Sequence, residues 1–175
     1  MTHTPGPPLL FLDIDGPLIP FGSPASGASP APDAGPGHPL LGRLDPTIGP
    51  RLLALGCTLV WATTWEHEAN EVVAPRIGLP PLPVIEWPAS PAVGVPRGLH
   101  WKTPALVAWA AGRPFVWVDD EIGAMDREWV AAQHPGPALL HRVDPATGLA
   151  YDDFTALADW LRGPARADCQ CRVPQ

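Results

Sequence analysis

Two aspartates, separated by a single residue, lie in the segment LLFLDIDGPL, residues 9–18. Four apolar residues precede Asp13, and Gly16 and Pro17 follow Asp15, so the pattern predicts a buried strand that ends where the carboxylates begin. In an extended chain, side chains two positions apart point to the same side. We therefore expect both carboxylates to face one site, where they could bind a cation or act on a substrate.

Three further polar groups follow apolar runs in a similar way. Thr63 and Thr64 end one run, Asp119 and Asp120 end another, and each pair stands directly before a helical pattern. Lys102 stands at the start of a further helical pattern and is the only lysine in the sequence, against ten arginines. In an open parallel sheet, ligands bind beyond the carboxyl ends of the strands. We therefore expect these groups to converge with the first two aspartates.

These residue types together suit phosphoryl transfer. A carboxylate can attack phosphorus and carry the phosphoryl group as an acyl phosphate. Mg²⁺ prefers oxygen ligands and is usually held by one or two carboxylates together with substrate phosphate. A hydroxyl and an ammonium can then hold the phosphoryl oxygens and offset charge in the transition state. The sequence contains a candidate for each of these parts.

Each motif also has a simpler interpretation when it is taken alone. The DIDG segment could belong to a calcium-binding loop, but the first and twelfth positions of that loop would be Phe11 and Gly22, neither of which is a ligand. The VDDE segment could be a strand end that meets solvent. Thr64 could cap a helix that has Glu66 and Glu68 in its first turn. The motifs taken together favour a catalytic site.

Alternating strand and helix patterns would position these groups. Short apolar runs, typical of strands buried on both faces, lie at 9–14, 57–63, 82–87, 114–119 and 137–143. Helical patterns lie at 45–56, 65–78, 101–112, 121–133 and 151–163. This alternation predicts an α/β fold with a central parallel sheet, right-handed crossovers and helices on both faces.

Length and composition indicate one folded domain. The 175 residues are enough for a sizeable core, and we expect a single domain over 1–163, with a flexible Pro- and Gly-rich loop at 22–39 and a flexible tail at 164–175. The net charge of −7 argues against broad electrostatic binding to nucleic acid or anionic membranes.

The sequence also predicts a cytoplasmic protein with no membrane segment. No apolar run approaches the roughly 18 to 20 residues that would span a bilayer, and the N-terminus MTHTPGPP has no export signal. The three cysteines form neither a disulfide framework nor a zinc-binding spacing, so a reducing compartment fits best.

The segments LLFLDIDG, LVWATTW, WKTP and FVWVDDE resemble, in this order, the four motifs of the haloacid dehalogenase (HAD) superfamily. A closer likeness, carried by LFLDIDGPL, WATTWEHEAN and VWVDDEIGAMDREW, is to the small HAD domains associated with RNA-repair proteins. More distantly, the chain is similar to the phosphatase half of polynucleotide kinase-phosphatase. The resemblance implies a Rossmann-like three-layer sandwich.

The resemblance also implies a role for each motif residue. Asp13 would be the nucleophile, and Asp15 would protonate the leaving group and then activate water. Thr63 or Thr64 would bind the phosphate, since the motif alone leaves open which of them aligns. Lys102 would steady both the nucleophile and the phosphate.

A magnesium site is implied next to the nucleophile. Asp119 and Asp120 would hold Mg²⁺ beside Asp13, and the backbone carbonyl of Asp15 would be a further ligand. The presence of Asp15 favours phosphate-ester hydrolysis, because the dehalogenases of this superfamily work without the second aspartate.

The resemblance predicts no cap domain. Neither the segment after the first strand nor PASPAVGVPRGLH, residues 88–100, can fold into one. An open site suits a bulky phosphorylated substrate, such as a nucleic-acid end or a phosphoprotein, or needs a partner protein that the sequence does not identify. The subfamily likeness and the open site favour a nucleotide or a nucleic-acid end as the substrate. Two alternatives remain open: a phosphatase for a small metabolite or a protein, and a HAD scaffold that binds without catalysis.

Overall fold

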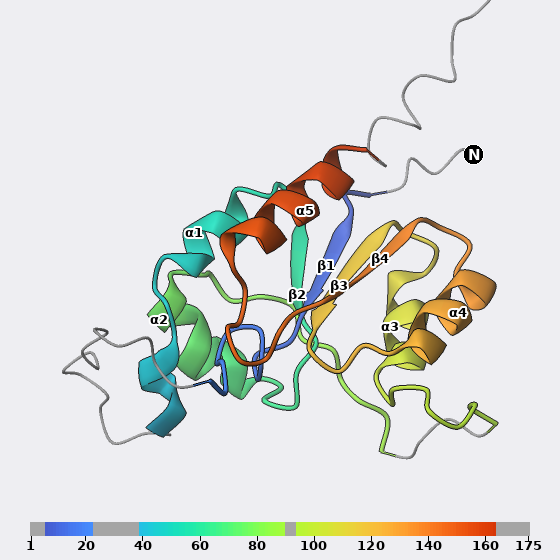
Figure 1. The fold of residues 1–175 in the computed structure, drawn as a ribbon, viewed down its shortest axis with the longest axis horizontal. Coiled ribbons are helices and arrows are strands. Elements are labelled where there is room, and N and C mark those ends of the chain that lie inside the picture. The colour runs from blue at the N-terminus through green and yellow to red at the C-terminus, as the bar shows by residue number, and fades with distance from the viewer. Residues whose placement is uncertain (1–5, 23–38, 90–93, 164–175) are drawn as a thin grey trace, which may run out of the picture.

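The computed structural model describes residues 6–22, 39–89 and 94–163 (Figure 1). Within these residues the centre is a parallel sheet of four strands in the order β2-β1-β3-β4. The strands are β1 (Leu9–Leu12), β2 (Thr58–Trp61), β3 (Phe115–Asp119) and β4 (Ala138–Arg142). The predicted loop at 22–39, apart from its two end residues, and the predicted tail at 164–175 lie outside the described residues.

Strands β1 and β3 form the middle of the sheet. Leu10 of β1 pairs with Leu59 of β2 on one side and with Val116 of β3 on the other. Every residue of β1 and β3 is buried, which explains why their sequences are apolar without alternation. The two most protected strands therefore end next to each other at the carboxyl edge of the sheet.

Helices cover both faces of the sheet (Figure 1). One face carries α1 (Ile48–Leu53), α2 (Ala74–Ile77) and α5 (Tyr151–Arg162), and the other carries α3 (Thr103–Ala110) and α4 (Ala124–Gln133). Leu10 and Leu12 pack in the core of the first face, whereas Leu9 and Phe11 pack in the core of the second. The predicted three-layer α/β sandwich is thus confirmed.

Each predicted helical range contains a helix, but the second begins later than expected. Residues 64–67 form turns, and Glu66 has a φ of 46°. A π-helix (Ala69–Val73) then runs directly into α2. Thr64 therefore does not cap a helix. None of the helices in the described part of the chain is long and apolar enough to cross a membrane.

The strand predicted at 82–87, the third of the five apolar runs, does not form. Val84 makes only an isolated bridge with Trp61, in which the Trp61 N–H donates to the Pro83 carbonyl at 2.8 Å and the Ile85 N–H donates to the Trp61 carbonyl at 3.0 Å. Prolines lack the N–H that a strand ladder needs, and three of them lie at 80, 81 and 83. The segment therefore borders β2 without extending the sheet.

The two positions where a cap domain would be inserted carry only small structures among the described residues. Between β1 and α1 there is a tight loop and a 3₁₀ helix (Pro39–Arg43), and residues 94–102 form turns and irregular chain. The described residues at both positions thus agree with the prediction of a HAD-like fold without a cap.

Candidate active site

Asp13 and Asp119 lie side by side at the carboxyl edge of the sheet. Asp13 directly follows β1, and Asp119 is the last residue of the neighbouring strand β3. The Asp13 N–H donates to the carbonyl of Val118 at 3.1 Å, which continues the pairing of the two strands. Parallel pairing therefore brings together two carboxylates that are far apart in the sequence.

Lys102 joins these two carboxylates from the N-terminal end of α3. Its Nζ lies 2.8 Å from Asp13 Oδ2 and 2.9 Å from Asp119 Oδ2. Lys102 is 3% exposed, Asp13 7% and Asp119 0%. Trp117, two positions before Asp119 in β3, donates its Nε1 hydrogen to Asp119 Oδ2 at 3.3 Å. The fold thus places one ammonium and two carboxylates in a single buried group.

This buried group has an excess of negative charge. Burial raises the pKa of Asp13 to about 7, although the Lys102 ammonium acts in the opposite direction. Burial tends to lower the pKa of Lys102, but the charges of Asp13 and Asp119 outweigh it and raise that pKa above the usual lysine value. Partial burial, and then the charge of Asp119, raise the pKa of Asp120. A divalent cation at this position would offset the excess charge.

Carboxylate oxygens of Asp13, Asp119 and Asp120 lie within 4.8 Å of one another. Mg²⁺ favours such a donor set, because it binds carboxylate oxygens and keeps its remaining positions for water and phosphate. Gly16 makes room for the Asp120 carboxylate: its φ is +88°, and a Cβ there would lie 2.6 Å from Asp120 Cγ. The Asp15 carboxylate does not belong to this donor set, and a contribution from its backbone carbonyl stays a prediction.

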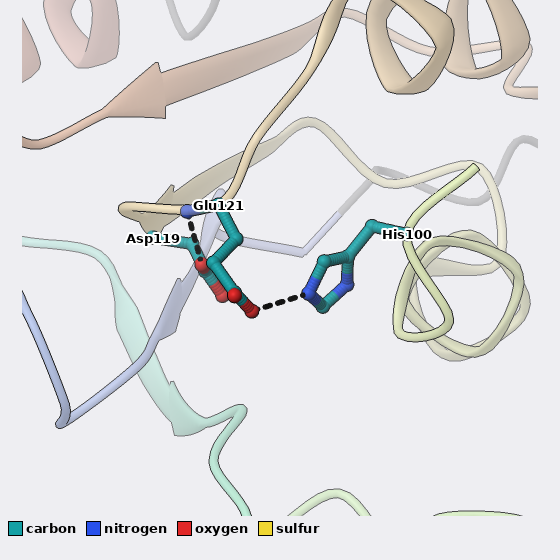
Figure 2. A group of neighbouring side chains, drawn as sticks. All are labelled: His100, Asp119 and Glu121. Carbon is teal, nitrogen blue, oxygen red and sulfur yellow. Dashed lines mark hydrogen bonds and ion pairs between the residues drawn. The ribbon is translucent and has the colours of Figure 1, made fainter. Parts of the chain in front are cut away.

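A second group of metal-binding residue types shares Asp119 with the first. It consists of His100, Asp119 and Glu121 (Figure 2). His100 Nε2 lies 3.1 Å from Glu121 Oε2, and the Glu121 N–H donates to Asp119 Oδ1 at 2.9 Å. The His100–Glu121 pair therefore links the loop that precedes Lys102 to the loop that follows β3.

Asp15 lies on a different side of the site. Its Oδ2 accepts a hydrogen bond from Trp65 Nε1 at 2.9 Å, and its backbone bridges to Ile19 in a tight loop after β1. It also borders an open hollow of about 430 Å³. The hollow is lined by Asp15, Leu40, Thr64, Trp65 and Glu68. The two aspartates of the DIDG segment thus make separate contacts, Asp13 with Lys102 and Asp15 with the hollow.

The two candidate threonines have different surroundings. Thr63 is fully buried; its Oγ1 accepts the Trp65 N–H at 3.3 Å, and its carbonyl accepts the Trp87 Nε1 hydrogen at 3.0 Å. Thr64 is exposed and lines the hollow beside Asp15. Thr63 therefore holds the end of β2 in place, whereas Thr64 is open to a ligand.

Asp126 is a buried residue of the site that the motif analysis did not single out. It is 1% exposed, and its Oδ1 accepts the His100 N–H at 2.8 Å and the Thr103 hydroxyl at 2.6 Å. Its Oδ2 accepts the N–H of Gly123 at 2.8 Å. Asp126 thereby fastens the segment that carries Lys102 to the start of α4. Its position three residues after the N-cap Gly123 is the signal that could have identified it.

A parallel α/β sandwich with these four motifs at its carboxyl edge is a HAD-type domain. The chain belongs to the family described as “HAD domain in Swiss Army Knife RNA repair proteins”, whose model matches residues 9–154. This confirms the superfamily and the subfamily that the motifs resemble. No curated protein and no solved structure matches the chain. Membership of the family indicates a HAD-type hydrolase, and HAD proteins generally use Mg²⁺, for which the acidic group is suited.

Proposed function

We propose that this protein is a Mg²⁺-dependent phosphatase that hydrolyses a phosphate monoester through an aspartyl-phosphate intermediate. The observation that carries the proposal is the position of Lys102 Nζ, 2.8 Å from Asp13 and 2.9 Å from Asp119. An ammonium in this position can hold the nucleophile and a phosphoryl oxygen together. The three sequence motifs that supply these residues come from different elements, so the arrangement is a property of the fold.

The metal would be held by the carboxylates of Asp13, Asp119 and Asp120. When bound, Mg²⁺ supplies positive charge that orients the phosphate and offsets charge in the transition state. Side chains of the protein position the reacting groups. Lys102 keeps one Asp13 oxygen in place, and Asp119 stays fixed by its contacts with Lys102 and Trp117.

In the first step, an Asp13 carboxylate oxygen attacks the phosphorus atom. The bond from phosphorus to the ester oxygen breaks, and that oxygen takes a proton from Asp15, which leaves the phosphoryl group on Asp13 as an acyl phosphate. Trp65 orients Asp15 for this transfer through the hydrogen bond from Nε1 to Oδ2 at 2.9 Å.

In the second step, Asp15 removes a proton from a water molecule, whose oxygen attacks the phosphorus atom. The acyl-phosphate bond breaks, inorganic phosphate leaves, and Asp13 is restored as a carboxylate. Asp15 has then returned to its protonated form for the next turnover. Thr64 is the exposed hydroxyl that can hold a phosphoryl oxygen, while the buried Thr63 supports the loop.

For the substrate, we propose a nucleotide or a nucleic-acid end. The description of the family as a domain of RNA repair proteins supports this class, as does the open hollow beside Asp15. The net charge of −7 makes the recognition local rather than a broad electrostatic attraction. The proposed compartment is the cytoplasm, which cysteines without a disulfide pattern favour.

Hydrolysis of a chromogenic phosphate monoester tests the proposed activity. We expect turnover by the wild type with Mg²⁺, its loss with a chelator, and its loss in Asp13→Asn, which keeps the size of the side chain. Asp159→Asn is the matched control, because Asp159 is an exposed residue of α5 that pairs with Arg162. Equal turnover by Asp13→Asn and the wild type would contradict the mechanism.

A further inference from the structure

The hollow beside Asp15 is the open part of the active site. Its volume of about 430 Å³ lies within the range of roughly 300 to 1,000 Å³ that is common for small-molecule pockets. It adjoins the residue that would protonate the leaving oxygen and lies apart from the Lys102 group. The alcohol part of a substrate must therefore leave through this hollow, if the proposed mechanism holds.

One wall of the hollow is an indole ring with a fixed orientation. Trp65 Nε1 donates to Asp15 Oδ2 at 2.9 Å, and the Trp65 backbone N–H donates to Thr63 Oγ1 at 3.3 Å. The side chain is half-buried, and Leu40 contributes a second apolar surface. Because these two hydrogen bonds already fix the Trp65 side chain, it loses little conformational entropy when a flat aromatic group stacks on its ring.

The polar part of the lining is acidic. Besides Asp15, the hollow contains the exposed carboxylate of Glu68 and the exposed hydroxyl of Thr64, and none of the described residues that line it is a lysine or an arginine. Such groups accept hydrogen bonds from hydroxyl and amino groups. The two carboxylates, Asp15 and Glu68, repel a further phosphate. The lining therefore favours a neutral leaving group that has a flat aromatic part and a part with several hydroxyl groups.

We propose that this hollow binds the nucleoside part of a nucleoside monophosphate, with the base against Trp65 and the sugar hydroxyls near Glu68. This inference rests on the proposed phosphatase function and narrows its substrate. The charge of Glu68 then lowers the affinity for substrates that carry a second phosphate close to the first. The end of a polynucleotide is such a substrate. Trp65 has two roles, since it stacks on the base and orients Asp15.

Steady-state kinetics on three substrates test this inference: adenosine 5′-monophosphate, adenosine 3′,5′-bisphosphate and glycerol phosphate. For the wild type we expect the highest kcat/KM with the monophosphate. Glu68→Gln raises the ratio of kcat/KM for the bisphosphate to that for the monophosphate by about fivefold, because one repulsive charge is removed. Glu71→Gln is the matched control, since Glu71 is exposed on the following turn and does not line the hollow.

Substitution of Trp65 separates its two roles. In Trp65→Leu we expect KM for the monophosphate to rise about tenfold, because base stacking is lost, while KM for glycerol phosphate stays the same. Trp65→Phe keeps the ring and restores this KM, but kcat falls for all three substrates because Asp15 loses its hydrogen-bond donor. Equal effects on the KM of all substrates, or a wild-type preference for the bisphosphate or a 5′-phosphorylated oligonucleotide, would overturn the inference.

Binding and turnover can fail separately. Calorimetry of adenosine 5′-monophosphate with Asp13→Asn and Mg²⁺ measures the affinity of the hollow for this ligand without catalysis. We expect binding, and we expect a further Trp65→Leu substitution to weaken it about tenfold. No binding would overturn the inference. If the wild type hydrolyses glycerol phosphate with Mg²⁺ as well as it hydrolyses the monophosphate, this inference fails and the phosphatase function stands. If the monophosphate binds but no monoester is hydrolysed, the phosphatase function fails instead.

Discussion

The two ends of the sheet bury titratable groups in opposite ways. At the carboxyl end, Asp13, Lys102 and Asp119 are almost fully buried, and the Lys102 ammonium lies within ion-pair distance of both carboxyl groups. At the amino end, Cys57 directly precedes β2 and His134 directly follows α4, and neither has a charged partner among the interactions of the described residues. Burial raises the pKa of the Cys57 thiol to about 11 and lowers the pKa of His134, so burial favours the neutral form of both groups.

This difference shows which end of the sheet contains buried charges that are unfavourable for stability. Removing a charge from water is unfavourable unless partners compensate, and a titratable group without partners stays neutral instead. The amino end follows that rule. The carboxyl end departs from it, because one ammonium is shared by two buried carboxyl groups, and this partial compensation leaves the pKa of Asp13 at about 7. Buried charge that is only partly compensated is typical of a site that is built to bind a cation and a phosphate.

The sharpest test of this comparison is to remove the ammonium at the carboxyl end. Lys102→Met leaves the carboxylates of Asp13 and Asp119 without their shared partner. We expect the free energy of unfolding to fall by about 3 to 5 kcal/mol without metal, as for other broken buried ion pairs, and turnover to fall by at least about 100-fold. Urea unfolding and monoester hydrolysis measure the two effects.

A double variant provides the control for Lys102. In Asp13→Asn the same Lys102→Met change should cost clearly less stability, because one of the two buried carboxylates has already lost its charge. An equal cost in both backgrounds would show that the ion pair does not account for the loss.

Metal binding is the next test, because among the described residues only the carboxyl end has an acidic donor set. At a Mg²⁺ concentration of 100 times the Kd, we expect the wild type to gain about 2.7 kcal/mol of stability, which thermal unfolding shows as a higher Tm. Asp120→Asn should lose most of this gain, whereas the exposed Asp159→Asn should keep it. A similar rise in Tm for both variants would mean that Mg²⁺ binds elsewhere.

Two left-handed glycines, one at each end, provide a matched pair. Gly16 has a φ of +88° and would place a Cβ 2.6 Å from Asp120 Cγ, whereas Gly56 has a φ of +68° and nothing within 4 Å. Both alanine variants should lose about 1 to 2 kcal/mol of stability from backbone strain. Only Gly16→Ala should also lose activity, by about 100-fold, because it displaces Asp120.

Thermal unfolding together with kinetics separates these two effects. A drop in activity in Gly56→Ala as large as that in Gly16→Ala would contradict the assignment of the metal site to the carboxyl end.

The smallest effect is expected from Cys57 at the amino end. Its pKa is about 11 in the folded protein against 9.0 as the reference value, so between these pH values the unfolded chain has lost a proton that the folded chain keeps. Stability must therefore fall as pH rises from 9 to 11. For this half-buried thiol we expect a loss of roughly 1 to 2 kcal/mol.

Comparison with Cys57→Ser checks this pH dependence. Serine does not titrate in that range, so urea unfolding should give a flatter stability profile between pH 9 and 11 for the variant. Identical slopes for the variant and the wild type would show that the thiol stays exposed.

The order of the motifs and their place at one edge of the sheet could be predicted from the sequence alone. Short apolar runs between helical patterns require a parallel sheet, and parallel strands end at the same edge. For this reason the sequence pattern predicts that Asp13 and Asp119 approach each other. The single lysine of the sequence, Lys102, could be expected there as well, because it follows the third apolar run at the start of a helix.

Other features depended on contacts between distant segments. The run at 82–87 looks like a strand, but its prolines and the hydrogen bonds of Asn70 to Leu82 keep it out of the sheet. The helix after Thr64 starts at Ala69, later than its sequence pattern indicates. Local patterns predict which conformation a segment prefers, and tertiary packing decides whether it is adopted.

The sequence by itself determined the fold class, the family and the set of candidate residues, because these depend on residue type, spacing and the period of the backbone. Only the tertiary structure decided which of these candidate residues contact one another. Strand β1 ends at Leu12, so the alternation of a strand no longer orients the chain at Asp15, and Asp15 contacts Trp65 rather than Lys102. Asp126 gains its role only because α3 and α4 start side by side. Such contacts depend on the paths of the loops, which the helix and strand periodicity of the sequence does not predict.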